Sequence, residues 1–212
     1  MKDLIIIGAS GFGREVAWHV ERINACNPTW NLIGFIDDNE KLQGKLINGY
    51  PIVGTTEDIN KYKDSYFVCA IGSASIRERI VHRISDNRGI KFATIIDPDA
   101  IVSDRVTVGE GTIICAGVIV TVNISIGCHC IITGGCTVGH DAVISDYVTV
   151  YPSTNISGMV HIGECVELGT GSKVIQGLQI GNNTIIGAGS VVIKDMPDNC
   201  KIVGVPARVI SL

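Results

Sequence analysis

A strict six-residue period of apolar residues runs through the second half of the chain. Counting in sixes from Ile96 meets an apolar residue at all 17 positions, and 16 of these are Ile or Val. The positions are Ile96, Val102, Val108, Ile114, Val120, Ile126, Ile132, Val138, Ile144, Val150, Ile156, Ile162, Leu168, Val174, Ile180, Ile186 and Val192. An amphipathic helix would repeat every three or four residues, and a half-buried strand every two. A period of six predicts a coil of short parallel strands, in which β-branched residues stack on the same position of the next turn.

Two further positions keep the same period. A small or weakly apolar residue follows four positions after the apolar one in most repeats, as at Ala100, Thr112, Cys130, Cys136, Ala142, Thr154, Ser172 and Ser190. Glycine directly follows seven of the apolar positions, at Gly109, Gly127, Gly139, Gly163, Gly169, Gly181 and Gly187. Since glycine tolerates a positive φ, we expect these seven glycines to form the sharp corners of the coil.

The first 96 residues carry a different pattern, in which short apolar runs alternate with helical spacing. We expect strands at 4–8, 32–36, 50–53 and 66–71, helices at 14–24, 56–62 and 73–87, and an extended segment at 92–96. Thr55 or Thr56 is the expected N-cap of the second helix. This order predicts a small Rossmann-like α/β domain over residues 1–96, followed by an all-β coil over residues 97–212.

A glycine-rich loop, Gly8-Ala-Ser-Gly11-Phe-Gly13, follows the first expected strand. Its pattern is G-x-x-G-x-G, not the G-x-G-x-x-G of dinucleotide-binding folds, which argues against NAD. Two interpretations stay open. The glycines allow a helix to pack tightly on the strand, or the helix N-terminus at Gly13 binds a phosphate of a nucleotide-linked sugar. In a Rossmann-like domain such a ligand lies at the carboxyl ends of the strands.

The coil resembles that of the hexapeptide-repeat acyltransferases, in which three sextets form each turn of a left-handed parallel β-helix. The whole chain resembles one subfamily, through GASGFGRE after the first strand, an Asp37-Asp38 pair after the second, AIGS at 70–73 and GVPAR at 204–208. This subfamily contains the bacterial nucleotide-amino-sugar N-acetyltransferases and the sialic acid O-acetyltransferase-like proteins. The resemblance implies a left-handed β-helix behind a small Rossmann-like domain.

The resemblance also implies which residues contact each substrate. Those expected to hold the nucleotide-linked sugar are Ser10, Gly11, Phe12, Asp37, Asp38 and Gly72. Those expected along coenzyme A are Thr149, Thr170, Ala188, Lys194 and Arg208. Two alternatives stay open: the Asp pair is a turn former, and the two basic residues belong to a solvated end cap.

His140 is expected at an outward corner of the coil, directly before Asp141. The resembling acetyltransferases place their general base in this His-Asp dipeptide. Many of them have an acidic residue before the His, whereas this chain has Gly139, so Asp141 or a neighbouring subunit must orient the ring. Gly158, 18 residues further on, should lie at the same corner and offer its N–H to a thioester oxygen. The alternatives are that His140 only packs at a subunit contact and that Gly158 only turns the corner.

Neither the histidines nor the cysteines predict a metal site. The γ-class carbonic anhydrases use the same coil with three zinc-binding histidines, but His129, His140 and His161 do not have that spacing. Cys130 and Cys136 occupy inward positions of consecutive sextets, which lie on different faces of such a coil. We therefore expect small buried thiols.

Charge and hydropathy limit the partners. A formal net charge of −4 argues against nucleic acid and anionic membranes. The chain has no run of 18 apolar residues, and its first residues do not resemble a signal peptide. These features predict a cytoplasmic protein.

The resemblance therefore implies an acetyl-CoA-dependent N-acetyltransferase acting on a nucleotide-linked amino sugar, such as a UDP- or dTDP-4-amino-4,6-dideoxy sugar, in bacterial surface glycan biosynthesis. It implies acetyl-CoA as the co-substrate, no metal, and a homotrimer with each active site between subunits. Two alternatives stay open: O-acetylation of a sugar such as sialic acid, and a non-catalytic scaffold that binds sugar nucleotides.

Overall fold

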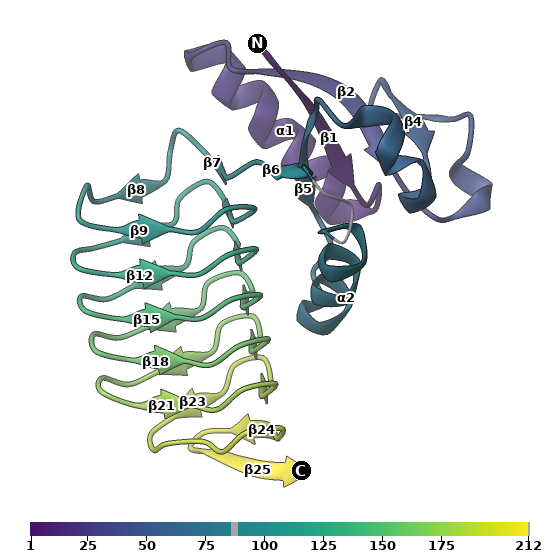
Figure 1. The fold of residues 1–212 in the computed structure, drawn as a ribbon. Helices are drawn as coiled ribbons and strands as arrows, with labels where there is room; N and C mark the ends of the chain where they lie inside the picture. Colours follow the sequence, from purple (N-terminus) through teal and green to yellow (C-terminus); the bar gives the residue numbers. More distant parts are fainter. Residues whose placement is uncertain (86–88, 212) are drawn as a thin grey trace.

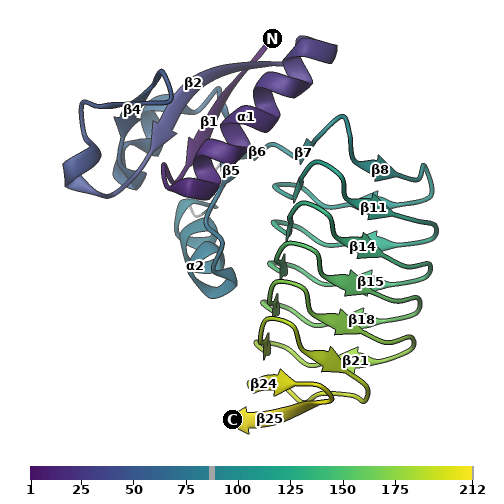
Figure 2. The ribbon, with the colours of Figure 1, turned by 180° about the vertical axis from the view of Figure 1, so that it is seen from behind.

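A computed structural model describes residues 1–85 and 89–211 (Figure 1). The chain forms a small α/β domain beside a tall coil, and the two termini lie at opposite ends of the molecule (Figures 1 and 2). This is the predicted fold class, a Rossmann-like domain followed by a left-handed parallel β-helix. No helix in the described ranges is both long and apolar enough to cross a membrane.

The small domain has one sheet with helices on both faces. The strands run in the order β3-β4-β2-β1-β5-β6, and all pair in parallel except β3, which is antiparallel to β4. The elements are β1 (Lys2–Ile7), α1 (Gly11–Cys26), β2 (Trp30–Ile36), η1 (Glu40–Leu42), β3 (Leu46–Ile47), β4 (Tyr50–Gly54), η2 (Thr56–Tyr62), β5 (Tyr66–Cys69), α2 (Ala74–Ser85) and β6 (Lys91–Phe92).

The predicted helices of this domain differ from the observed ones mainly at their ends. Helix α1 begins at Gly11 instead of residue 14, because the N–H of Arg14 already bonds to the carbonyl of Ser10 (3.1 Å). The second helix is a 3₁₀ helix, and Thr55 is its cap, in a capping box with Asp58. Helix α2 extends to Ser85, and its predicted end at residues 86–87 lies outside the described residues.

The coil has three faces, each a stack of two-residue parallel strands, and face 1 ends in a longer antiparallel hairpin. Face 1 contains β7 (Ile95–Ile96), β10 (Ile113–Ile114), β13 (Ile131–Ile132), β16 (Thr149–Val150), β19 (Glu167–Leu168), β22 (Ile185–Ile186), β24 (Lys201–Gly204) and β25 (Ala207–Ser211). Face 2 contains β8 (Ile101–Val102), β11 (Ile119–Val120), β14 (Thr137–Val138), β17 (Asn155–Ile156), β20 (Lys173–Val174) and β23 (Val191–Val192). Face 3 contains β9 (Thr107–Val108), β12 (Ser125–Ile126), β15 (Val143–Ile144), β18 (His161–Ile162) and β21 (Gln179–Ile180). Strands pair 18 residues apart, as Ile114 does with Ile132.

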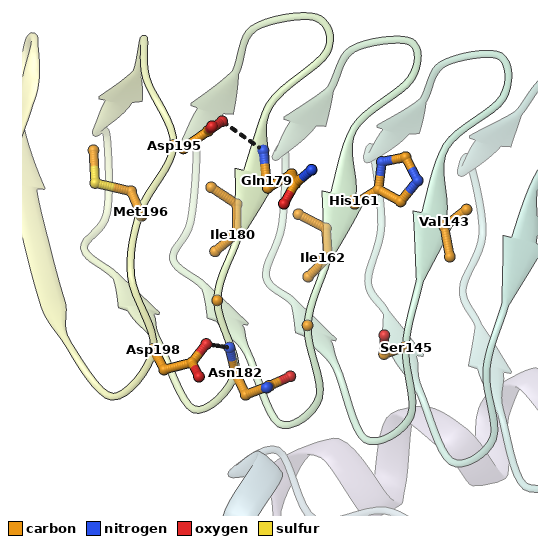
Figure 3. Close-up of a pocket in the computed structure, with 12 residues that line it drawn as sticks. Val143, Ser145, His161, Ile162, Gln179, Ile180, Asn182, Asp195, Met196 and Asp198 are labelled. Carbon is orange, nitrogen blue, oxygen red and sulfur yellow. Dashed lines mark hydrogen bonds between the residues drawn. The ribbon is translucent and has the colours of Figure 1, made fainter.

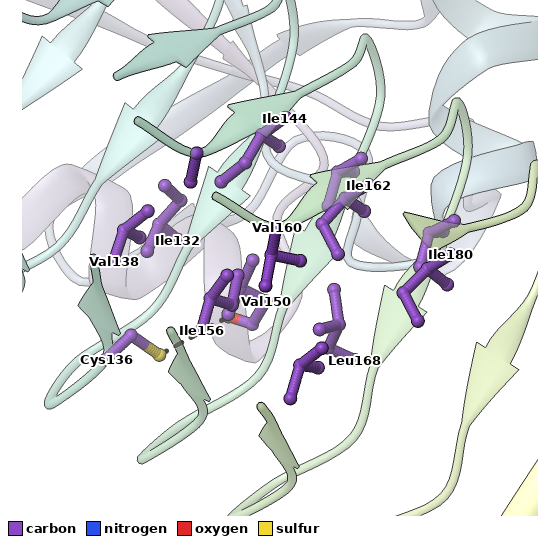
Figure 4. Close-up of a cluster of buried hydrophobic side chains, with 14 of the residues drawn as sticks. Ile132, Cys136, Val138, Ile144, Val150, Ile156, Val160, Ile162, Leu168 and Ile180 are labelled. Atoms are coloured by element: carbon purple, nitrogen blue, oxygen red, sulfur yellow. Dashed lines mark hydrogen bonds between the residues drawn. The ribbon is translucent and has the colours of Figure 1, made fainter. Parts of the chain in front are cut away.

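The periodic apolar residues fill the inside of the coil (Figure 4). From Ile114 to Val192 each of them is buried, and the small residues four positions later close the remaining space. Cys130 and Cys136 belong to this second set and are fully buried, which confirms the interpretation as packed thiols. The three periodic residues of the first turn are the exceptions: Ile96 is 36% exposed, and Val102 and Val108 are partly buried, because no earlier turn covers them.

The prediction for the seven corner glycines was wrong. The positive φ angles fall at every sixth residue from 111 to 189, which is two positions after the expected glycines. The seven predicted glycines serve a different purpose, which is close approach between turns. A Cβ at Gly139 would lie 2.6 Å from the backbone nitrogen of Gly158, and one at Gly109 would lie 2.5 Å from the carbonyl carbon of Gly127. These positions exclude a side chain by contact, not by φ.

The small domain covers face 1. Val16 and Val20 of α1 belong to one buried cluster with Ile113 and Ile131 of the coil. At the top of this contact, Nδ1 of the buried His19 lies 2.6 Å from Oδ2 of Asp97, which also accepts a hydrogen bond from Arg22 Nε (2.8 Å). These contacts fix helix α1 against the first turn of the coil.

A second link between the domains is the fully buried guanidinium of Arg77 on α2. Its acceptors are the carbonyl oxygens of Ile71, Gly72, His129, Tyr147 and Val148 and the hydroxyl of Thr149. The side chain therefore joins the loop after β5 to two successive turns of the coil. Since a buried polar group needs partners, this bonding requires the two domains to keep one relative position.

Candidate active site

His140 and Asp141 lie together at the corner between faces 2 and 3, after β14. Nδ1 of His140 lies 2.8 Å from Oδ2 of Asp141, and about half of each side chain is exposed. The hydrogen bond with His140, followed by one from Asn123 (3.2 Å), lowers the pKa of Asp141. Asp141 therefore orients the ring where Gly139 has no side chain to do so. With Nδ1 facing the carboxylate, Nε2 is the ring nitrogen that makes no hydrogen bond within residues 1–85 and 89–211.

Gly158 lies directly next to the His140 ring, one turn along the coil. A Cβ at Gly158 would lie 2.5 Å from Nε2 and 2.6 Å from Cε1 of His140, so the ring occupies the space of a side chain. Within residues 1–85 and 89–211, the Gly158 N–H has no acceptor. Gly158 is itself buried.

The crevice predicted at the carboxyl ends of the parallel strands is present in the small domain. It has a volume of about 160 Å³ and is lined by Gly8, Asp37, Asp38 and Ile71 among others. Asp37 accepts the N–H of Ala9 (2.8 Å) and so ties the acidic pair to the glycine-rich loop.

Asp38 is bonded within the small domain. It accepts the N–H (2.7 Å) and hydroxyl (2.8 Å) of Thr56 and a hydrogen bond from Arg83 (3.2 Å). Burial alone would raise the pKa of Asp38, but these donors lower it. Both acids thus shape the loops around the crevice, and Asp37 is the less exposed of the two.

The glycines of the loop 8–13 are required for different structural reasons. A Cβ at Gly13 would overlap the carbonyl oxygen of Gly8, and Gly8 has a φ of 96°, so both are needed for tight packing of α1. Gly11 faces open space, with only an Arg14 nitrogen 3.9 Å away. Ser10 caps α1 through its backbone and makes no side-chain cap bond. The hydroxyl of Ser10 and the open side of Gly11 are therefore available to a ligand.

A larger cavity of about 400 Å³ separates the loop from the coil, and we call it the interdomain cavity. Its walls include Phe12, Glu15 and Gly72 of the small domain and Gly134, Tyr151 and Pro152 of the coil. Two of the residues predicted to hold a nucleotide-linked sugar, Phe12 and Gly72, thus meet here and not in the crevice. Of the other four, Asp37 and Asp38 line the crevice, and Ser10 and Gly11 line neither space.

Both domains of the chain match families of known proteins. Residues 3–84 match the PglD N-terminal domain, and residues 159–194 match the bacterial transferase hexapeptide model. A perosamine N-acetyltransferase variant from Caulobacter crescentus, solved with CoA and GDP-perosamine, is 31% identical over 100% of this chain and 98% of its own, with a TM-score of 0.88. The chain belongs to the hexapeptide-repeat nucleotide-amino-sugar N-acetyltransferase family.

Two other members of this N-acetyltransferase family give the same result. The acetyltransferase domain of PglB from Neisseria gonorrhoeae, solved with acetyl coenzyme A, is 31% identical over 99% of each chain, with a TM-score of 0.90. UDP-N-acetylbacillosamine N-acetyltransferase from Bacillus subtilis is 39% identical over 55% of this chain and 52% of its own length. The chain spans about half the length of the curated relatives that it matches.

The residues that the family resemblance assigned to coenzyme A do not gather at one place in a single chain. Thr170 and Ala188 are exposed and adjacent at the corner between faces 1 and 2, where Gly189 N–H bonds to the Thr170 carbonyl (2.8 Å). Lys194 is exposed at the corner of His140, and Arg208 lies in the end hairpin, opposite Val203. Their joint role stays a prediction.

Thr149 differs from the other four. It is fully buried under the small domain, and its hydroxyl donates to the carbonyl oxygen of Gly72 (2.7 Å) and accepts from Arg77 (2.9 Å). This placement gives Thr149 a part in the contact between the domains and lends no support to its predicted contact with coenzyme A.

The outer surface of face 3 has a shallow hollow of about 360 Å³ around His161, Gln179 and Asp198 (Figure 3). None of the predicted site residues lines it. Its acids are bonded within the coil, since Asp195 accepts the N–H of Gln179 (2.9 Å) and Asp198 accepts that of Asn182 (2.7 Å). In the described ranges, no three or more His, Cys, Asp or Glu side chains are placed to hold a metal ion.

Sequence reasoning missed four residues around the interdomain cavity: Glu15, Arg77, Tyr151 and Glu167. Glu167 accepts the N–H of Ala74 at the start of α2 (2.9 Å) and the hydroxyl of Tyr151 (3.0 Å). Burial, and then the nearby Glu167, raises the pKa of Tyr151 to about 12. The sequence held one signal for Glu167. It is a charged residue at a position of the repeat where earlier turns have the apolar residues Ile95, Ile113 and Ile131.

Proposed function

We propose that this protein transfers the acetyl group of acetyl-CoA to the amine of a nucleotide-linked amino sugar. The observation that carries the proposal is the His140–Asp141 pair beside Gly158. It occurs in a chain that aligns along its full length with an N-acetyltransferase solved with CoA and GDP-perosamine. A non-catalytic scaffold would have no need for an oriented, solvent-accessible histidine.

In this reaction the amine nitrogen forms a bond to the thioester carbonyl carbon, and the carbon–sulfur bond breaks. Nε2 of His140 takes the proton that the amine loses and returns it to the departing sulfur, so that coenzyme A leaves as the thiol. General-base help of this kind is worth about 10²–10⁴-fold. The Gly158 N–H is the candidate donor to the carbonyl oxygen as charge develops there, a contribution of about 10²–10³-fold.

The position of His140 supports a homotrimer with active sites between subunits. The corner between faces 2 and 3 lies opposite face 1, and face 1 is the one that the small domain covers. A sugar nucleotide held by the small domain of one chain is therefore remote from the His140 of that chain. A second copy can present its own His140, and exposed apolar residues such as Ile101 and Ile119 on face 2 provide a surface for packing.

Complementation between subunits tests this arrangement. Asp37→Ala damages the crevice and His140→Ala removes the base, so each homo-oligomer should be nearly inactive. Co-expression should yield mixed oligomers in which an intact crevice meets an intact His140, and activity should return. Absence of recovery in oligomers shown by mass to contain both chains would place the whole site within one subunit.

We assign the nucleotide to the crevice at Gly8, Asp37 and Asp38, and the reaction to the cytoplasm, where acetyl-CoA and nucleotide sugars are available. Relatives named for UDP- and GDP-linked sugars leave the base of the nucleotide open. The deciding assay is thiol release from acetyl-CoA with UDP-, dTDP- and GDP-linked 4-amino sugars, with mass spectrometry of the product. Turnover on hydroxyl sugars and none on amines would replace this proposal by O-acetylation.

A further inference from the structure

Asn123 lies on the turn of the coil directly before the His140–Asp141 pair. It precedes Asp141 by 18 residues, which is one full turn, and the N–H of Asp141 donates to the carbonyl oxygen of Val122 (3.1 Å). Asn123 and Asp141 both have a left-handed backbone, with φ angles of 56° and 59°. Apart from glycine, Asn and Asp tolerate this conformation best. The corner therefore presents both side chains, one turn apart, at little cost in strain.

The amide of Asn123 bonds to the carboxylate that orients His140. Nδ2 of Asn123 donates to Oδ1 of Asp141 (3.2 Å), and Oδ2 of Asp141 lies 2.8 Å from Nδ1 of His140. An ionised carboxylate only accepts hydrogen bonds, so each oxygen of Asp141 has one donor. In the described ranges Asp141 is the only acid among the residues with a positive φ. An amide stacked on a carboxylate therefore occurs at one corner of the coil, and it is the corner of His140.

The Asp141 carboxylate has no other side-chain partner to hold it. About half of this side chain is exposed, and it makes no further hydrogen bond or ion pair within residues 1–85 and 89–211. Without Asn123 the carboxylate could turn toward water. The hydrogen bond at Nδ1 determines which nitrogen of a neutral imidazole carries the proton. A turned carboxylate would let the proton move to Nε2, the nitrogen that has to accept a proton from the amine.

We propose that Asn123 is a positioning residue for the general base. It holds the Asp141 carboxylate in the orientation that keeps the proton of the neutral His140 ring on Nδ1. The proposal rests on the proposed function, in which Nε2 accepts the proton of the amine. Because Asn123 acts through Asp141, its loss should lower kcat and leave the KM values of both substrates nearly unchanged.

The first experiment removes the amide with Asn123→Gly. Glycine adopts a positive φ freely, so this variant loses the side chain without straining the corner. We expect kcat to fall by about 3–10-fold, the effect of one lost hydrogen bond. The matched control is Asn183→Gly, at an exposed corner with a φ of 55°, where the side chain makes no hydrogen bond within residues 1–85 and 89–211. It should keep the kcat of wild type. A wild-type kcat in Asn123→Gly would refute the role.

A double variant tests whether Asn123 acts through Asp141. In the Asp141→Gly background the carboxylate is absent, so Asn123→Gly should have almost no further effect on kcat. An equal loss of kcat in both backgrounds would show that Asn123 acts by another route, and the proposal would be wrong.

The pH profile gives a readout that a purely structural role would not change. Asn123→Asp keeps the shape of the side chain but replaces the donor by a second carboxylate. Its charge favours the imidazolium form of His140, so the acid limb of kcat should move up by about half a pH unit. Asn183→Asp should leave the limb in place. An unmoved limb in Asn123→Asp would separate Asn123 from the catalytic pair and overturn the proposal. The other charged residues along this corner, none of them bonded to His140 or Asp141 in the described ranges, are Asp104, Arg105, Lys194 and Asp195.

A measurement on the resting protein does not depend on turnover. In protein labelled with ¹⁵N-histidine, nuclear magnetic resonance distinguishes the two neutral tautomers, and the signals of His140 are those missing from His140→Ala. The ratio of the Nδ1-protonated to the Nε2-protonated form should fall by about 3–10-fold in Asn123→Gly and stay constant in Asn183→Gly. An unchanged ratio in Asn123→Gly would by itself overturn the proposal. If the ratio falls but wild type transfers no acetyl group, the proposed function fails while the positioning role stands.

Discussion

Replacement of Gly158 by Ala tests the His140 geometry most directly. The backbone at Gly158 is outside the left-handed region, so Ala fits the chain there, and Ala keeps the N–H. The new methyl group would lie 2.5 Å from Nε2 and 2.6 Å from Cε1 of His140, where ordinary contacts begin near 3.4 Å. The ring must therefore move by about 1 Å, and a displacement of this size costs about 10²-fold in rate.

The stability of the protein should change little, within about 0.5 kcal/mol, because the half-exposed ring can move toward solvent. The assay is thiol release from saturating acetyl-CoA and sugar nucleotide, with Tm measured in parallel. We expect kcat to fall by about 10²-fold with both KM values nearly unchanged. The control is Gly49→Ala, at a φ of 87° with open space around it, which should lower Tm and leave kcat unchanged.

A double variant separates the possible causes. In the His140→Ala background there is no ring to displace, so Gly158→Ala should have almost no further effect on kcat. An equal loss in both backgrounds would show that Gly158 acts independently of His140. A Gly158→Ala enzyme with kcat within threefold of wild type would refute the idea that His140 works from its observed position.

Three further outcomes follow from the same structure. His140→Ala should reduce kcat by at least about 10²-fold with little change in acetyl-CoA affinity, and a near-normal kcat at neutral pH would end the general-base assignment. Ile162→Ala removes buried methyl groups inside the coil and should cost about 2–5 kcal/mol in urea unfolding, whereas Ile101→Ala, at 65% exposure, should cost far less. Burial, followed by the nearby Arg77, lowers the pKa of His129 from 6.5 to about 4, so the unfolded chain binds a proton in this range that the folded chain does not. Stability should therefore fall by up to about 3 kcal/mol as the pH drops from 6.5 to 4, and His129→Asn, compared by urea unfolding at both pH values, should lose this part of the acid sensitivity.

The coil was predictable because each of its positions is set locally. An Ile at every sixth residue faces inward whatever its neighbours are, and pairing 18 residues apart then follows, as between Ile114 and Ile132. The same period placed His140 and Gly158 at one corner. It did not reveal which glycines turn the chain, because glycine serves both positive φ and close approach, and sequence spacing alone does not distinguish the two.

The contacts between the domains were not predictable in the same way. Arg77 bonds to the carbonyl of Tyr147, and Ala74 bonds to Glu167, across 70 and 93 residues of sequence. Such pairs follow no period, because they depend on how two separately patterned domains pack. For the same reason Thr149, assigned to coenzyme A by family resemblance, lies buried under the small domain.

Four corners of the coil hold residues whose positive φ lowers the stability of the folded protein. Tyr147, Ser153, Met159 and Cys165 all adopt a φ between 55° and 61°, a conformation that costs L-residues other than Gly, Asn and Asp about 1–2 kcal/mol each. Of these four, Ser153 and Met159 are exposed, so Asn at either position would relieve backbone strain without altering the packed interior. Each such substitution should raise the melting temperature independently. A lineage of this protein in a hotter habitat can therefore gain stability by one corner substitution at a time.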